Sequence, residues 1–229
     1  MPVILHIETS TNVCSVTLSE NGKILFEKID VQGQNHSKVL GIFAKDILNN
    51  AKNDNKTIDA IAISCGPGSY TGLRIGVSFA KGLCYGLNVP LIAINTLKLM
   101  AYGFLVEENP EKGSLLCPMI DARRMEVYSA FFNTNLEEIR PTSADIIDES
   151  SYFDLLQKRV YFFGNGSEKC KTQITHPNAY FVSEKTPLSK YMISLAEKDF
   201  EKYNFKDTAY FEPFYLKEFI ASTPKNKVF

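Results

Sequence analysis

Residues 65–86 read CGPGSYTGLRIGVSFAKGLCYG, and the rest of the predicted fold is built around this stretch. The run before it, residues 58–64, is short and apolar, which is typical of a buried strand. A helix is predicted to follow. Small and polar residues permit the tight reversal between strand and helix, and two of them can cap the helix. These residues are Gly66, Gly68, Ser69, Thr71 and Gly72.

The predicted helix over residues 72–86 is almost without charge. Its charged residues, Arg74 and Lys81, share one narrow stripe of the helical wheel. A helix that is apolar over most of its girth needs cover on more than one side, and one face of a sheet supplies only one cover. We therefore expect a further element to lie over it. Two rows of small residues at i, i+4 spacing would let another backbone approach closely. The rows are Gly72, Gly76 and Ala80, and Ser78, Gly82 and Gly86.

The same loop has a second interpretation, as a phosphate-binding turn. Its spacing Gly66-x-Gly68-x-x-x-Gly72 is one residue too long for the dinucleotide fingerprint, and no Gly-Lys-Ser or Gly-Lys-Thr follows. Pro67 also removes one N–H group from any anion site. A structural turn is therefore favoured over direct nucleotide binding. The weak candidates for nucleotide contact are Glu8, Gly66, Gly68, Ser69 and Thr71.

The composition is that of an ordinary globular protein. The chain has 229 residues, of which 45% are hydrophobic and 22% charged, enough for one domain or two small ones. Its formal net charge of −1 argues against tight, autonomous binding of RNA or DNA. Any nucleic acid is therefore expected to be held by a partner.

Several features predict a cytoplasmic protein. The five cysteines are scattered without a C-x-x-C pair, which indicates a reducing compartment. Residues 1–8 lack the basic segment of a signal peptide, and Glu8 interrupts the apolar run. The longest uncharged stretch, residues 82–97, is too short to span a membrane. No membrane association is expected.

The predicted order of elements in the first half is βββαβαβα. Three antiparallel strands are expected at residues 3–7, 13–18 and 23–29, with a turn at Asn21-Gly22. The later elements are an amphipathic helix over residues 35–50, a strand at 58–64, the helix at 72–86, a strand at 90–94 and a helix at 96–104.

The pattern restarts after residue 107. An apolar run at residues 115–120 ends in Asp121, as the first strand ends in Glu8, and residues 126–132 alternate into a second strand. A third strand is expected after Asn133-Thr134-Asn135. We interpret this as an internal duplication at an offset of roughly 110 residues. Hairpins are common enough for the agreement to arise by chance.

The remainder of the second half is less regular. It predicts a helix over residues 143–158, a strand at 160–163, a turn at 164–166, a strand at 180–182 and a helix over 188–202. A tail rich in aromatic residues follows from Thr208. It either packs its rings into a groove of this chain or docks another protein. The rings belong to Tyr210, Phe211, Phe214, Tyr215 and Phe219.

Few residues offer catalytic chemistry. Glu8 is the best single candidate for a polar site, because ligands in such folds sit at the carboxyl ends of strands; its structural alternative is to cap the loop that follows. The histidines His6, His36 and His176 form no i, i+4 pair, so no metal is expected. Ser69 lies on a strand-to-helix turn but outside a Gly-x-Ser-x-Gly motif. No catalytic residue is assigned.

Taken together, these motifs resemble the bacterial TsaB family of tRNA threonylcarbamoyladenosine biosynthesis proteins. The resemblance runs essentially end to end and is strongest over the first 130 residues. It is carried by residues 4–11, His36-Ser37, the loop at 66–76, Asp121-Ala122-Arg123-Arg124, Gly164-Asn165-Gly166 and Tyr215-Leu216-Lys217.

The resemblance implies an α/β protein with the actin/hexokinase-like (ASKHA) fold. Such a fold has two ribonuclease-H-like halves, each a mixed sheet with helices. We expect residues 1–106 to form the N-terminal half, which carries the partner-binding helices, and residues 107–229 to form the C-terminal half.

The resemblance also implies an accessory subunit and not an enzyme. The family binds and activates the related catalytic subunit TsaD, which works with the ATPase TsaE to place a threonylcarbamoyl group on the adenosine next to the tRNA anticodon. TsaD-like subunits carry a His-x-x-x-His metal pair where this chain has His36 and Leu40. We therefore expect no metal, TsaE reached through TsaD, tRNA only indirectly, and ATP or ADP only with the partner complex.

The partner surface is implied to lie on the first two helices, residues 35–48 and 72–86. The same helices can form a homodimer in the family, so a dimer is expected to compete with TsaD. The expected interface residues are Val39, Phe43, Ile47, Gly72, Arg74, Ile75, Gly76, Phe79, Ala80 and Leu83.

Two other classes of function stay open. One is an autonomous enzyme, either a metal-dependent glycoprotease-like peptidase or an ATP phosphotransferase. The missing histidine pair argues against the first, and Glu8-Thr9-Ser10 against the second, because phosphotransferases of this kind usually have Asp followed by Gly there. The other class is a homodimeric regulatory binding module.

Overall fold

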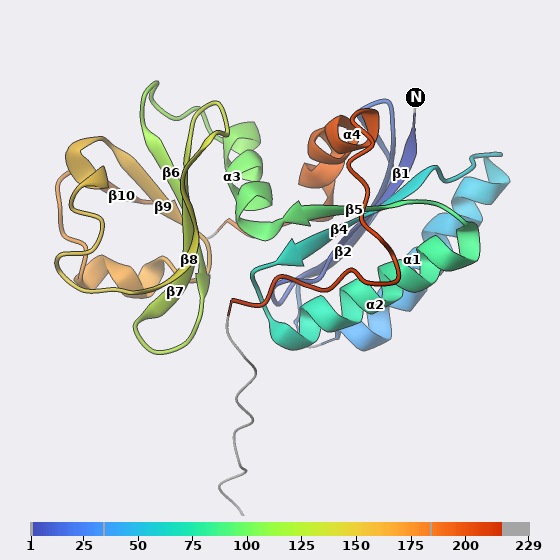
Figure 1. Ribbon diagram of the computed structural model, residues 1–229, viewed down its shortest axis with the longest axis horizontal. Helices are drawn as coiled ribbons and strands as arrows, with labels where there is room; N and C mark the ends of the chain where they lie inside the picture. The colour runs from blue at the N-terminus through green and yellow to red at the C-terminus, as the bar shows by residue number, and fades with distance from the viewer. Residues whose placement is uncertain (1, 34, 184, 217–229) are drawn as a thin grey trace, which may run out of the picture.

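Two five-stranded mixed sheets form the framework of the molecule, one in each half (Figure 1). The computed structural model describes residues 2–33, 35–183 and 185–216. The strands of the first sheet are β1 (Val3–Glu8), β2 (Cys14–Glu20), β3 (Lys23–Asp30), β4 (Ala60–Gly66) and β5 (Leu91–Asn95). Their order is β3-β2-β1-β4-β5, with an antiparallel meander from β1 to β3 and with β4 and β5 parallel to β1.

The second sheet has the same arrangement of strands as the first sheet. In order across the sheet, its strands are β10 (Ala179–Phe181), β9 (Val160–Phe163), β6 (Leu115–Asp121), β7 (Glu126–Asn133) and β8 (Glu138–Ile146). β6, β7 and β8 form the antiparallel meander, and β9 and β10 run parallel to β6. The predicted fold of two ribonuclease-H-like halves is therefore confirmed.

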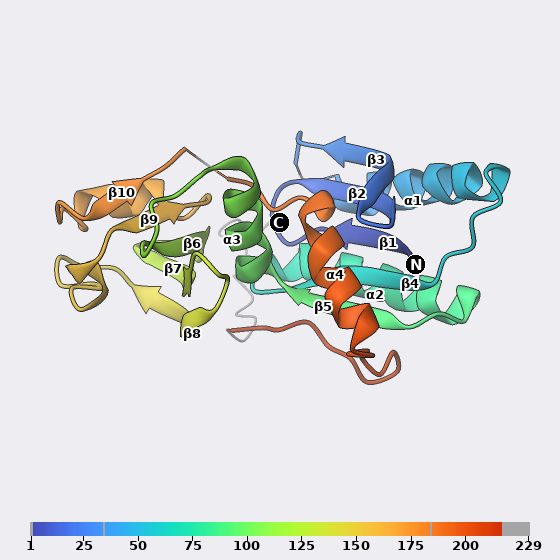
Figure 2. The same ribbon diagram turned by 90° about the horizontal axis from the view of Figure 1, so that it is seen from above.

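Helices cover both faces of the first sheet. The helices are α1 (His36–Asn53), α2 (Tyr70–Leu87), α3 (Thr96–Glu107) and α4 (Ile193–Glu201), and the 3-10 turns are η1 (Leu155–Gln157), η2 (Glu168–Thr172) and η3 (Ser189–Met192). α1 and α2 lie side by side on one face, and α4 lies on the other (Figures 1 and 2). No helix in the described parts of the chain is both long enough and apolar enough to cross a membrane.

The two-residue period of β1 separates two cores. Leu5 and Ile7 face α1 and α2 and belong to the cluster on that side of the sheet. Ile4 faces the opposite side, where it joins Ile92 of β5 and Leu195 of α4. The first sheet is thus buried on both faces, which explains its nearly continuous apolar strands.

α3 joins the two halves and stands between the two sheets (Figure 2). Asn95 caps it, because the Asn95 side-chain oxygen accepts a hydrogen bond from Lys98 N at 3.0 Å. Phe104 of α3 stacks on Phe163 of the second half, with ring centroids 4.5 Å apart. Apolar side chains of α3 therefore pack against apolar side chains of the second half at the junction.

The chain returns to its first half after completing the second. η3 and α4 pack on the first sheet, and Ser189 N donates a hydrogen bond to Ser15 Oγ of β2 at 2.9 Å. The predicted boundary between residues 106 and 107 stays a prediction. The elements from residue 189 onward, which that prediction assigned to the C-terminal half, belong to the core of the first half.

One predicted element is wrong. The helix expected over residues 143–158 is replaced by the end of β8, a series of turns and η1. Asp148 explains part of the difference, because its Oδ1 accepts hydrogen bonds from Ser150 N at 2.9 Å and from Ser151 Oγ at 3.0 Å. Short polar side chains that bond the nearby backbone favour turns over helix interiors.

Candidate partner interface

The turn that starts α2 is packed directly against the β1–β2 loop. Ser69 caps α2, with its Oγ accepting a hydrogen bond from Gly72 N at 3.3 Å. Ser69 N donates to the carbonyl oxygen of Ser10 at 2.7 Å, and Thr9 Oγ1 donates to the carbonyl oxygen of Gly72 at 2.8 Å. A Cβ on Gly72 would lie 2.1 Å from the carbonyl oxygen of Thr9. The contact between the two loops therefore accounts for glycine at this position without a nucleotide.

The five weak candidates for nucleotide contact do not share one surface. Ser69 and Thr71 are exposed, Gly68 is half-buried, and Gly66 and Glu8 are buried. Gly66 has φ of +111°, and a Cβ there would lie 2.6 Å from the carbonyl oxygen of residue 214. A structural turn stays the favoured interpretation of this loop, and nucleotide contact stays the weaker alternative.

Glu8 lies wholly inside the first half and holds the loop that follows it. Its Oε1 accepts hydrogen bonds from the N and the Oγ of Ser10, each at 2.5 Å. Its Oε2 has no hydrogen-bond partner among the described residues. Burial raises the pKa of Glu8 to about 7, and the hydrogen bonds from Ser10 oppose that rise. The geometry is that of a loop cap and not of an open polar site.

His6 lies two residues earlier on the same face of β1 and is also fully buried. Its Nε2 shares a hydrogen bond with Ser19 Oγ at 2.8 Å, and burial lowers its pKa to about 3. In the described residues, no group of three or more histidine, cysteine, aspartate or glutamate side chains is arranged to hold a metal ion.

Four of the ten predicted interface residues are buried in the chain itself. They are Ile47, Gly72, Gly76 and Ala80. A Cβ on Gly76 would lie 2.1 Å from Thr9 Oγ1 and 3.1 Å from Ile63 Cδ1. The row of Gly72, Gly76 and Ala80 therefore receives the chain's own first loop and sheet. The prediction that a partner's backbone contacts this row is wrong.

The second row of small residues on α2 faces solvent. Ser78, Gly82 and Gly86 are exposed, and a Cβ on either glycine would meet nothing within 4 Å. Tyr85 on the same face is 90% exposed, and Arg74 is exposed one turn before Ser78. This open face of α2, defined by Arg74, Ser78, Gly82, Tyr85 and Gly86, is a surface that another helix could approach closely.

The remaining predicted residues line the boundary between α1 and α2. They are half-buried and pack on the core of the first half while keeping part of their surface outside. Ile42 of α1, which the prediction left out, is 58% exposed. The residues of this boundary are Val39, Phe43, Ile75, Phe79 and Leu83.

Part of the aromatic tail lies beside the open face of α2. Residues 206–216, called the strap from this point, run along α2 on the side of β5 (Figure 1). Lys81 Nζ donates hydrogen bonds to the carbonyl oxygens of Ala209 at 3.0 Å and Phe211 at 3.1 Å. Tyr215 packs on Tyr70 with ring centroids 4.9 Å apart.

The strap explains most of the aromatic tail. Phe211 packs on the core of the first half, whereas Tyr210 is 85% exposed. Phe219 lies outside the described residues. The first of the two predicted roles, packing on this chain, thus holds for Phe211 and Tyr215. The sequence signal for the strap was its content of aromatic residues, but that content did not indicate which helix they cover.

Known proteins resemble this chain over most of its length. The family model TsaD, tRNA N6-adenosine threonylcarbamoyltransferase, matches residues 23–227. The chain is 31% identical over 205 residues to the tRNA threonylcarbamoyladenosine biosynthesis protein TsaB of Buchnera aphidicola subsp. Baizongia pistaciae, covering 85% of this chain and 89% of the relative. It is 27% identical over 226 residues to the TsaB of Haemophilus influenzae, covering 93% of each.

A solved structure supports the same comparison. The structure of YeaZ from Pseudomonas aeruginosa has a TM-score of 0.77 and 25% sequence identity to this chain. The match covers 94% of this chain and 100% of that chain.

Proposed function

Because the chain belongs to the TsaB family of tRNA threonylcarbamoyladenosine biosynthesis proteins, which the TsaD family model also matches, we propose that it is an accessory subunit that binds and activates TsaD. In this role it takes part in tRNA modification, and TsaD carries out the transfer. TsaE reaches the chain through TsaD, and the complex works in the cytoplasm.

The open face of α2 is the observation that supports this proposal. A long helix with two exposed glycines and an exposed tyrosine leaves room for a partner helix. A specific interface of ordinary size would bury roughly 1,200–2,000 Å² in total, which the face of α2 can reach only together with its neighbours α1 and the strap. We therefore place TsaD on this combined surface.

A non-catalytic role agrees with the interior of the first half. Glu8, the polar residue at the carboxyl end of β1, is enclosed and bonded to Ser10, so it cannot reach a substrate in this conformation. The loop amide of Ser69 is likewise engaged by Ser10. These contacts favour an accessory subunit over an autonomous peptidase or phosphotransferase.

The proposal is tested by placing a large side chain on the open face. Gly82→Trp should fold normally, because nothing lies within 4 Å of a Cβ there, and should lose TsaD in a co-purification assay. Lys158→Trp, an exposed position in the second half, is the control and should retain TsaD. A folded Gly82→Trp protein that still binds TsaD as tightly as the wild type would overturn the proposal.

A homodimer through the same surface competes with TsaD in this scheme. Sedimentation velocity of the wild type alone should then show a dimer that dissociates when TsaD is added. Gly82→Trp should be monomeric under the same conditions. A dimer that persists in Gly82→Trp would place self-association on another surface.

A further inference from the structure

The β6–β7 hairpin holds two consecutive arginines in a strained backbone conformation. Arg123 has φ of +69° and Arg124 has φ of +48°. In the described parts of the chain they are the only neighbouring pair of non-glycine residues with positive φ. An L-residue in this region costs roughly 1–2 kcal/mol, which glycine avoids and asparagine reduces. Of the other non-glycine residues with positive φ in the described parts of the chain, three are asparagines and three are not. They are Asn21, Asn55 and Asn88, and Leu136, Tyr152 and Tyr203.

Lys169, whose side chain is partly exposed, fixes the hairpin backbone. Lys169 Nζ donates hydrogen bonds to Asp121 Oδ1 and to the carbonyl oxygens of Arg124 and Glu126, the last two at 2.7 Å. Asp121 Oδ1 also accepts from Arg123 N at 2.9 Å. The side chains of Lys169 and Asp121 therefore hold the strained conformation, and the two arginines take part only through their backbone atoms.

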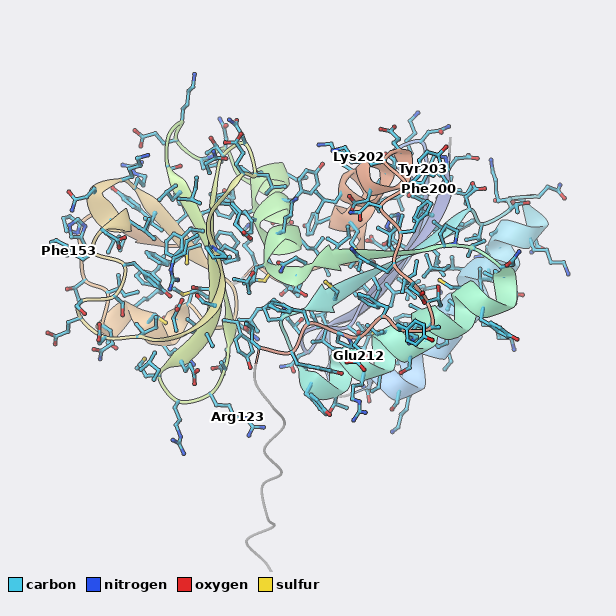
Figure 3. All side chains as sticks on the ribbon, viewed as in Figure 1. Arg123, Phe153, Phe200, Lys202, Tyr203 and Glu212 are labelled. Atoms are coloured by element: carbon cyan, nitrogen blue, oxygen red, sulfur yellow. The ribbon has the colours of Figure 1, made fainter. Side chains whose placement is uncertain are left out.

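The two guanidinium groups have no partner among residues 2–33, 35–183 and 185–216. Arg123 and Arg124 are both exposed, and neither side chain makes a hydrogen bond or an ion pair with another described residue. Figure 3 places Arg123 at the lower edge of the molecule, at the β6–β7 end of the second half. Asp121, the acid at the base of the hairpin, is already paired with Lys169.

The position of the hairpin matches a ligand site of open α/β sheets. It follows the carboxyl end of β6, the strand that corresponds to β1 in the repeated topology. Ligands of such sheets bind beyond the carboxyl ends of the strands. Guanidinium groups bind phosphate with paired hydrogen bonds, and two on a rigid turn present a preorganised fork.

We propose that Arg123 and Arg124 bind phosphate groups, either of tRNA or of a nucleotide. The tRNA source rests on the proposed function, because that function brings the chain to a tRNA substrate. The net charge of −1, which argued against autonomous RNA binding, averages over the whole chain and does not describe this local pair of cations.

The test compares three full-length double variants with the wild type. R123A/R124A removes both cations, and R123G/R124G removes them while relieving the backbone strain. K112A/K158A is the control, because it removes the same amount of charge from exposed positions at the other end of the second half. Binding to an unmodified tRNA transcript is measured by anisotropy at several salt concentrations, for the chain alone and with TsaD.

We expect R123A/R124A and R123G/R124G to lose about tenfold or more in tRNA affinity at low salt. The slope of log affinity against log salt should become shallower by about 1.5–2, as expected for two lost phosphate contacts. The control variant should change neither value. R123G/R124G should also unfold at a higher temperature than the wild type, because the strain has been removed.

Calorimetry with ATP and ADP separates the two phosphate sources. Loss of nucleotide binding with unchanged tRNA binding supports the proposal with a nucleotide as the ligand, and the reverse supports it with tRNA. The proposal is overturned if the wild type binds neither ligand, if R123A/R124A binds both ligands as tightly as the wild type, or if the control loses as much affinity.

The result is separable from the proposed function. TsaD co-purification is measured on the same proteins, and the hairpin variants should keep TsaD while Gly82→Trp loses it. If the wild type itself fails to bind TsaD, the proposed function falls, and the measurements on the isolated chain still decide whether the hairpin binds phosphate.

Discussion

The buried carboxyl group of Glu8 makes the stability of the first half depend on pH. Its pKa is about 7 in the folded protein against 4.5 for an ordinary glutamate, because burial disfavours the charged form. Between these pH values the unfolded chain releases a proton that the folded chain keeps. The stability contributed by the protonated group is therefore complete below about pH 4.5 and is lost as the pH rises through about 7.

We expect Glu8→Gln to be more stable than the wild type at pH 8 by about 2–3 kcal/mol, because the amide has nearly the same shape and carries no charge. The difference should shrink at pH 5, where Glu8 is mostly protonated. His6 is buried in its neutral form, so its contribution to the stability of the protein decreases as the pH falls. Both proteins contain His6, so this effect does not change the comparison.

Urea unfolding at the two pH values checks the Glu8 prediction. Glu212→Gln, an exposed carboxyl group on the strap (Figure 3), serves as the control and should show no pH-dependent difference. An equal stability difference at pH 5 and pH 8 for Glu8→Gln would contradict the assignment of the raised pKa.

Two glycines of α2 should respond in opposite directions to the same substitution. Gly72→Ala places a Cβ 2.1 Å from a backbone oxygen, so we expect a loss of about 2 kcal/mol or more in the free energy of unfolding. Gly82→Ala meets open space in a helix interior and should gain about 0.5–1 kcal/mol. Thermal or urea unfolding of both proteins checks this pair, and stabilisation by Gly72→Ala would refute the packing described for the loop.

These glycines also show what the spacing of small residues along a helix can predict. The i, i+4 spacing predicted two rows of small residues on α2, and both rows exist. The spacing did not determine which row faces the sheet, because helical periodicity relates residues to one another and not to the neighbouring strands. Assigning Gly72 and Gly76 to a partner was wrong for that reason.

Among the elements, those with a strong local signal were predicted best. The meander with Asn21-Gly22, the strand-to-helix turn at β4 and α2, and the capped helix α3 all form near their expected bounds. The strap could not be derived, because it has no regular period and its position depends on α2 and β5. The helix expected over residues 143–158 failed because short polar side chains bond the local backbone there.

The strap should contribute to stability through one ring. Phe211→Ala removes a ring that packs on the core of the first half, so we expect the free energy of unfolding to fall by about 1–3 kcal/mol. Tyr210→Ala removes a neighbouring ring that is 85% exposed and should change stability by less than about 0.5 kcal/mol. Urea unfolding of the two variants checks the prediction, and equal losses would mean that the strap does not depend on Phe211.

At the scale of the whole molecule, the two halves are not independent. The first sheet is covered on one face by η3 and α4, which follow the second half in the sequence. The repeated topology was readable from the two restarting strand patterns. The return of the chain was not, because an amphipathic helix near residues 193–201 carries no signal for the sheet it covers.

We expect residues 1–106 expressed alone to lack a cooperative unfolding transition. Without η3 and α4, apolar residues such as Ile4 and Ile92 on the inner face of the first sheet would meet water. A fusion of residues 1–106 to 186–216 through a flexible linker should recover the transition. Circular dichroism during urea titration distinguishes the two proteins, and a fragment 1–106 that unfolds cooperatively at the wild-type midpoint would disprove this dependence.

The interleaving of α4 with the first sheet has a consequence for synthesis on the ribosome. Chains grow from the N-terminus, and domains usually fold as they emerge. In this protein the strands of the first sheet emerge long before the helix that seals them, so the nascent chain carries an unfinished layer while nearly a hundred further residues are made, from β5 to α4. During this interval the uncovered apolar face of that layer is open to contact with other chains, and exposed apolar surface of this kind promotes aggregation.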